Sequence, residues 1–195
     1  MQATFADLER YEKILESLAE RVRRATAALE KHSVPYAVIG GNAVAAWVMQ
    51  IDPEAVRNTR DVDIAIRRAD LDRATEAMAE AGFKFRQVLG IAMFVDAVKP
   101  TVKGGVHLVF STEKVRPEYN HAVPVIPENP PRSMDGYAII PLESLLAMKL
   151  TSFRDKDRTH VRDMLEVGLI TPEIEASLPP DLMARLQQLK DDPNG

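Results

Sequence analysis

Two short segments constrain the fold of this chain more than any other part of its sequence. The first, VIGGNAVAAWV at residues 38–48, passes from an apolar stretch through Gly40 and Gly41 into helix-forming residues. The second, DVDIAI at residues 61–66, alternates polar and apolar side chains with the period of a β-strand. We therefore predict a strand, a glycine turn and a helix, followed by a strand that carries two aspartates.

The rest of the pattern predicts an α+β fold with a small mixed β-sheet and flanking helices. Further strands are predicted at residues 83–88, 91–98 and 106–110. Helices are predicted within residues 4–32, 42–49, 68–81, 141–153, 159–167 and 178–189. We divide the chain into a domain at residues 1–140, which includes the N-terminal helix, and a helical C-terminal portion at residues 141–195 packed on it.

Composition and charge argue against several classes of function. The chain has 195 residues and a formal net charge of -4, so it has no strong basic field, although a local basic patch would be averaged away. It has no cysteine, which excludes disulfides and thiolate metal sites. The N-terminus is charged, and no apolar run approaches the roughly 18 residues of a membrane span. We expect a cytoplasmic protein with no membrane partner.

Asp61 and Asp63 are the first candidates for chemistry. Side chains at positions i and i+2 of a strand point to the same face, so the two carboxylates lie close together and repel each other. A divalent cation relieves this repulsion, and Mg²⁺ prefers one or two carboxylates completed by water and phosphate oxygens. The alternative is an edge strand with its polar side in solvent.

Gly40 and Gly41 stand where a phosphate can approach the backbone. A glycine pair between a strand and a helix allows close approach, and the start of the helix offers free N–H groups. Such a pair is often only a turn. Together with the two aspartates about 20 residues later on the next strand, it predicts a site that joins phosphates to a metal.

GGNAVAAW followed by RNTRDVDI resembles the nucleotidyltransferase superfamily that includes DNA polymerase beta. The spacing of Arg57, Thr59, Asp61 and Asp63 is similar to AbiEii-type toxin nucleotidyltransferases, as is LLAMKLTSFRDKDRTHVRDMLEV at residues 145–167. The resemblance covers roughly residues 35–167 and implies the nucleotidyltransferase fold.

The resemblance implies a role for each matching residue. Gly40 and Gly41 would cradle the phosphates of an NTP, and Asp61 and Asp63 would bind Mg²⁺, with two ions in the active complex. The other residues that it places in the nucleotide site are Asn42, Arg57, Thr59 and Lys149, of which Lys149 would meet the triphosphate. The family often has serine directly after the first glycine, where this chain has Gly41 and then Asn42. The Asn42 amide either donates to phosphate or caps the helix.

The reaction implied by the resemblance is attack by an acceptor hydroxyl on the α-phosphate, with release of pyrophosphate. The acceptor is an RNA end, a protein side chain or a small molecule. The AbiEii likeness adds a toxin held in check by an antitoxin protein. A catalytically degenerate protein that binds nucleotide or a partner is the alternative.

His107 is the main departure from the family pattern, because it stands where the resemblance predicts a third carboxylate. Histidine is a general base near neutral pH but a poor ligand for Mg²⁺. Three interpretations stay open: a base in a modified site, a lost activity with retained nucleotide binding, or a strand histidine without a role. We also predict that Asp96 lies opposite His107 in a hairpin and either orients it or supplies the missing carboxylate.

The C-terminal charges have a plainer interpretation. Lys149 is alternatively a solvated helix lysine. The run RDKDR at residues 154–158 is interpreted as a solvated, salt-bridged turn. His121 and His160 have no partner at zinc-ligand spacing, so no structural zinc is expected.

Overall fold

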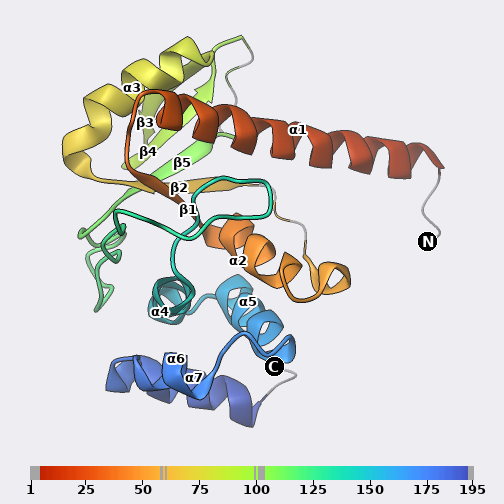
Figure 1. Ribbon diagram of the computed structural model, residues 1–195, viewed down its shortest axis with the longest axis vertical. Helices are drawn as coiled ribbons and strands as arrows, with labels where there is room; N and C mark the ends of the chain where they lie inside the picture. The colour runs from red at the N-terminus through yellow and green to blue at the C-terminus, as the bar shows by residue number, and fades with distance from the viewer. Residues whose placement is uncertain (1–4, 58, 60, 99, 101–103, 193–195) are drawn as a thin grey trace.

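A computed structural model describes residues 5–57, 59, 61–98, 100 and 104–192, with side chains from residue 16 onward. A single sheet forms the middle of the molecule, with helices above and below it (Figure 1). The predicted α+β fold with a small mixed sheet is confirmed. None of the helices in the described part of the chain is long and apolar enough to cross a membrane.

The sheet has five strands in the order β1-β2-β5-β4-β3. Their bounds are β1 Tyr36–Ile39, β2 Val62–Ile66, β3 Phe83–Val88, β4 Ile91–Asp96 and β5 Val106–Phe110. The pair β2 and β5 is parallel, and the other neighbouring strands are antiparallel. The parallel register sets Asp63 of β2 directly beside His107 of β5.

The period-2 pattern of β2 sends alternate residues to two different hydrophobic clusters. Val62, Ile64 and Ile66 face a cluster built with the helices α1 (Phe5–Lys31) and α3 (Leu71–Glu80). Ala65 faces the opposite cluster, which α2 (Gly40–Met49), α4 (Leu142–Ser152) and α5 (Asp155–Glu166) complete. Asp63 has the parity of Ala65, so its carboxylate lies on the α2, α4 and α5 side.

The last helices extend this second cluster. Below α4 and α5 lie α6 (Pro172–Ala176) and α7 (Pro180–Asp191), at the bottom of Figure 1. One cluster contains Ala37 of β1, Leu145 of α4 and Leu186 of α7, all of them buried. The C-terminal helices therefore share a core with the sheet, and the division at residue 140 stays a prediction.

Several helix boundaries differ from the predicted ones for local reasons. The helix predicted to begin at residue 159 begins at Asp155, whose carboxylate suits the positive end of a helix. The short helix α6 was not predicted; Pro172 occupies its first turn, and the Thr171 hydroxyl accepts a hydrogen bond from the Ile174 N–H. A short 3₁₀ helix at Pro53–Ala55 was also not predicted, and the helix predicted from residue 68 begins with a 3₁₀ turn at Arg68–Asp70 before α3.

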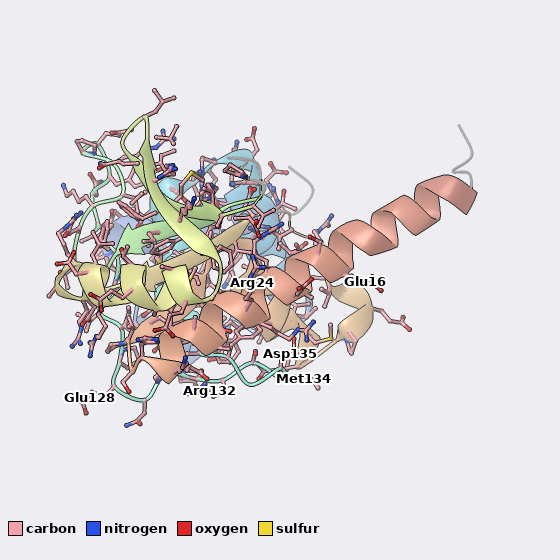
Figure 2. All side chains as sticks on the ribbon, turned by 90° about the horizontal axis from the view of Figure 1, so that it is seen from above. Glu16, Arg24, Glu128, Arg132, Met134 and Asp135 are labelled. Atoms are coloured by element: carbon pink, nitrogen blue, oxygen red, sulfur yellow. The ribbon has the colours of Figure 1, made fainter. Side chains whose placement is uncertain are left out.

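The predicted pairing of Asp96 with His107 is wrong. In the β4–β5 ladder His107 stands opposite Met93, which is an odd number of residues from Asp96. An odd offset puts the two side chains on opposite faces of the sheet. Asp96 instead accepts a hydrogen bond of 2.8 Å from Nη2 of Arg24 on α1, the residue labelled in Figure 2. Asp96 therefore lies on the opposite face of the sheet from His107.

Candidate active site

The start of α2 is pressed against Asp63. The helix begins at Gly40, directly after β1 and two residues earlier than predicted. Gly40 has a φ of +68°, and a Cβ added there would lie 2.2 Å from Oδ2 of Asp63. A side chain at this position would be strained and would collide with the carboxylate. Glycine is therefore required where the helix start meets the aspartate.

Gly41 makes a second close approach, to two residues from distant segments. A Cβ added at Gly41 would lie 2.8 Å from Oγ1 of Thr59 and 3.5 Å from Cε1 of His160. The first turn of α2 is thus packed between the loop that precedes β2 and the helix α5. The structure brings the predicted residue Thr59 to the glycine turn.

Asn42 joins the two predicted motifs. Its Nδ2 donates to the backbone carbonyl of Asp61 at 2.6 Å, so the amide fixes the start of β2 against the start of α2. Asn42 is not the cap of the helix: Ile39 occupies that position and makes no capping hydrogen bond through its side chain. The helix therefore begins without a side-chain partner for its first N–H groups.

Asp63 and His107 form a pair across the parallel strands. The distance between Nδ1 of His107 and Oδ1 of Asp63 is 3.2 Å, and both side chains are about a quarter exposed. The hydrogen bond to Asp63 raises the pKa of His107 against the opposing effect of burial, and the charges of Asp63 and Asp61 raise it further. Two carboxylates and an imidazole thus act on one another at this end of the sheet.

Lys149 is buried in an ion pair. Its Nζ donates to Oδ1 of Asp157 at 3.0 Å, and the two side chains are 6% and 1% exposed. Oδ2 of Asp157 accepts hydrogen bonds from Ser152 and Arg154, both at 2.7 Å. Burial opposes ionisation of Asp157, but Arg154, Lys149 and Ser152 outweigh it and lower its pKa to about 2.

This pair corrects the sequence interpretation of two features. Lys149 is not a solvated lysine, and burial lowers its pKa although Asp157 and Asp63 oppose that shift. The segment at residues 154–158 is not a solvated turn throughout, because it begins α5 and buries Asp157 completely. Only Asp155 and Arg158 form the expected exposed pair.

Arg57 fastens the loop before β2 to α5. Its Nε donates to both carboxylate oxygens of Asp163, at 2.8 and 2.9 Å. The Arg57 side chain is 62% exposed, while that of Asp163 is buried. The hydrogen bond to Asp163 raises the pKa of Arg57. The structure therefore gives Arg57 a partner on the same helix that contacts Gly41.

His160 was missed by sequence reasoning as a member of this site. Burial, helped by the charge of Lys149, lowers its pKa to about 4, so the ring is neutral near pH 7. Its Nδ1 is buried and has no hydrogen-bond partner among the described residues. The spacing of Asp157, His160 and Asp163, three residues apart on one helix, was the signal that would have indicated a shared face.

The carboxylates suit a hard cation. Asp61 and Asp63 are the oxygen ligands that Mg²⁺ prefers, and both remain partly accessible. Within the described residues no group of three or more acidic or histidine side chains is arranged to hold a metal. The pair fits an ion that completes its coordination with water and with the oxygens of a phosphate bound near Gly40 and Gly41.

Comparison with known proteins bears on the fold. Neither a scan against protein-family models nor a search of curated proteins found a match. Among solved structures, an antigenic nucleotidyltransferase-like protein from Paracoccidioides brasiliensis aligns with a TM-score of 0.57 and 20% identity, covering 92% of this chain and 90% of that one. ANT(2'')-Ia in complex with adenylyl-2''-tobramycin aligns with a TM-score of 0.55 and 11% identity, covering 88% and 97%.

The chain therefore has the fold of the nucleotidyltransferases. The predicted superfamily resemblance is supported at the level of the fold. The finer resemblance to AbiEii-type toxins stays a prediction.

Proposed function

We propose that this protein is a nucleotidyltransferase that moves a nucleoside monophosphate from an NTP to an acceptor hydroxyl and releases pyrophosphate. The observation that carries the proposal is the contact of Gly40 with the Asp63 carboxylate, which joins a helix N-terminus to a pair of carboxylates. Helix N-termini attract phosphate, and carboxylate pairs attract Mg²⁺. An NTP with its metal has the charges that both halves of the site require.

Each part of the site has a role in this proposal. The backbone N–H groups at Gly41 and Asn42 bind phosphate oxygens, because no side-chain cap occupies the start of α2. Asp61 and Asp63 would hold Mg²⁺. When bound, the metal would supply charge stabilisation to the phosphate oxygens. Thr59, packed on Gly41, lines the same turn, and Arg57 keeps its loop against α5.

His107 takes the place of the third carboxylate as the proton acceptor. Its Nδ1 is oriented by Asp63, so Nε2 is the atom that receives the proton of the acceptor hydroxyl. A bond forms between the acceptor oxygen and the α-phosphorus, and the bond from that phosphorus to the bridging oxygen breaks. Pyrophosphate leaves with the electron pair.

The acceptor that we propose is a small molecule or a protein hydroxyl in preference to a long RNA. The net charge of -4 does not favour a large phosphate footprint. One structural neighbour, ANT(2'')-Ia, was solved with adenylyl-2''-tobramycin, in which a small molecule carries the adenylyl group. A toxin role would require growth arrest when the chain is expressed alone.

The test compares the wild type with an Asp61→Asn/Asp63→Asn variant in the presence of each NTP. Saturation at about 100 times the dissociation constant stabilises a folded protein by about 2.7 kcal/mol. We expect such a Mg²⁺-dependent rise in melting temperature in the wild type and its loss in the variant. The transfer of α-labelled phosphate to small-molecule and protein acceptors is followed in parallel. Asp135→Asn, on an exposed loop, is the control.

Two outcomes would contradict the proposal. A wild type that no NTP stabilises lacks the predicted substrate site. A wild type that binds NTP through Asp61 and Asp63, yet transfers no label to any acceptor, supports the binding module in which His107 marks a lost activity.

A further inference from the structure

Lys149 is poorly placed for the role that its sequence position suggests. Its side chain is 6% exposed, and its ammonium donates to the fully buried Asp157. Little of Lys149 is therefore open to a phosphate, and drawing its ammonium away from Asp157 would leave that carboxylate buried without the charge that balances it. The pair joins α4 to α5 and therefore holds these helices together.

Lys156 is placed for the role instead. It is exposed and lies in the first turn of α5, four residues before His160, so both side chains share one face of that helix. His160 lies against Gly41. That face is therefore directed toward the start of α2. The ammonium of Lys156 makes no ion pair with any residue that the structure describes.

The electrostatic neighbours of Lys156 place its charge over the candidate site. Its ammonium lowers the pKa of His107 on β5, of Lys149 on α4 and of His160 on α5. Of these three residues, His107 contacts Asp63, Lys149 is influenced by the charge of Asp63, and His160 lies against Gly41. The charge of Lys156 thus acts on residues of three elements at the site.

The start of α2 adds to this positive field, whereas the first turn of α5 also holds the carboxylates of Asp155 and Asp157. Ile39 at the start of α2 and Arg154 at the start of α5 both lack a capping hydrogen bond through their side chains. The free N–H groups of a helix start attract anions. Lys156 lies on the second of these two helix starts and faces the first.

We propose that Lys156 binds the β- and γ-phosphates of the nucleotide, and that the Lys149–Asp157 pair is a buried clamp that positions α5 for this contact. The inference rests on the proposed function for the identity of the nucleotide. Its anion site, however, can be tested without one. The chemical class of ligand is a linear polyphosphate, whose several charges suit a lysine between two helix starts.

The experiment titrates the full chain with inorganic triphosphate and with inorganic phosphate, using calorimetry. Lys156→Gln should weaken triphosphate binding by about tenfold, because a charge-assisted hydrogen bond is lost. Binding of inorganic phosphate should change by less than about twofold, since one phosphate is held by the start of α2. Lys156→Arg should retain most of the affinity. Lys84→Gln, which removes an equal charge from the exposed side of β3, should leave both affinities unchanged.

Failure of the inference about Lys156 can be distinguished from failure of the proposed function. Equal triphosphate affinity in the wild type and Lys156→Gln would overturn the inference, as would a wild type that binds no triphosphate. Lys156-dependent triphosphate binding without NTP binding would support the anion site and contradict only the proposed function. Normal NTP use by Lys156→Gln would overturn the inference and leave the proposed function standing.

Discussion

Single residues hold the two halves of the site in contact. Gly40 is in the left-handed region with φ of +68° and touches the carboxylate of Asp63. Glycine is therefore required here both by the backbone conformation and by the lack of space for a side chain. Asn42 then fixes the backbone of Asp61 through its amide. The position of each aspartate is therefore determined by a residue of the glycine turn.

Gly40→Ala should lower the free energy of unfolding by about 3 kcal/mol or more and move Asp63 away from its place. The left-handed backbone costs an alanine roughly 1–2 kcal/mol, and overpacking adds about 1–3 kcal/mol. Gly82→Ala is the matched control, because Gly82 also has positive φ but a Cβ there meets nothing within 4 Å. Chemical denaturation measures both. Equal losses in the two variants would mean that the contact with Asp63 contributes nothing.

At the scale of elements, the α4–α5 contact is the best-defined polar feature of the interior. Asp157 of α5 accepts hydrogen bonds from Lys149 and Ser152 of α4 and from Arg154 at its own helix start. A buried carboxylate with three donors fixes the angle and register of two helices. That register in turn brings His160 to Gly41.

Lys149→Met should destabilise the protein by about 3 kcal/mol, because it leaves the buried Asp157 without its ammonium partner. Asp157→Asn in the same chain should restore part of the loss, so that the double-mutant cycle shows coupling of about 1 kcal/mol or more. The same cycle on the exposed Lys31–Glu80 pair should show no measurable coupling. Additive effects of Lys149→Met and Asp157→Asn would refute the clamp. Urea denaturation supplies the free energies.

At the scale of the whole molecule, the sheet separates an α1–α3 side from the side that carries the chemistry. Arg24, Asp96 and Phe83 lie on the first side, where the guanidinium of Arg24 pairs with Asp96 and stacks over Phe83. Asp63 and His107 lie on the second. The C-terminal helices close that second side and share its hydrophobic core.

The half-buried, neutral His160 should make the whole fold acid-sensitive. Its pKa is about 4 in the folded protein against 6.5 for a free histidine. The unfolded chain therefore binds this proton first, and stability falls as the pH drops from 6.5 toward 4. The loss is on the order of 3 kcal/mol. Burial and the charges of Lys149 and Lys156 lower this pKa, whereas Asp157 and Asp163 raise it.

His160→Gln should flatten that part of the profile. The difference between variant and wild type isolates His160, because His107, whose raised pKa gives the opposite sign, is present in both. Asp157 loses its contribution only below its unfolded value, near pH 3.8 and under. Denaturation midpoints from pH 7 to pH 4 measure the slope. Parallel profiles for the two proteins would refute a half-buried, neutral His160.

The sequence by itself determined the strand with Asp61 and Asp63, the passage from β1 into α2 at the two glycines, and the mixed α+β architecture. These features follow from short-range rules. Apolar residues at every second position predict a strand, and segments rich in helix-forming residues predict helices. They place both motifs on neighbouring elements, and the sequence therefore located the part of the site that is local in the chain.

Only the tertiary structure decided the partners of the site. The register of β4 on β5 sent Asp96 to the opposite face. Because β4 is apolar at every position from Ile91 to Val95, no alternation in its sequence indicates which face each side chain takes. The packing of α4 on α5 buried Lys149 on Asp157 and brought His160 to Gly41. Such contacts depend on helix angles and on surface removed from water by segments far apart in sequence, and no local rule contains that information.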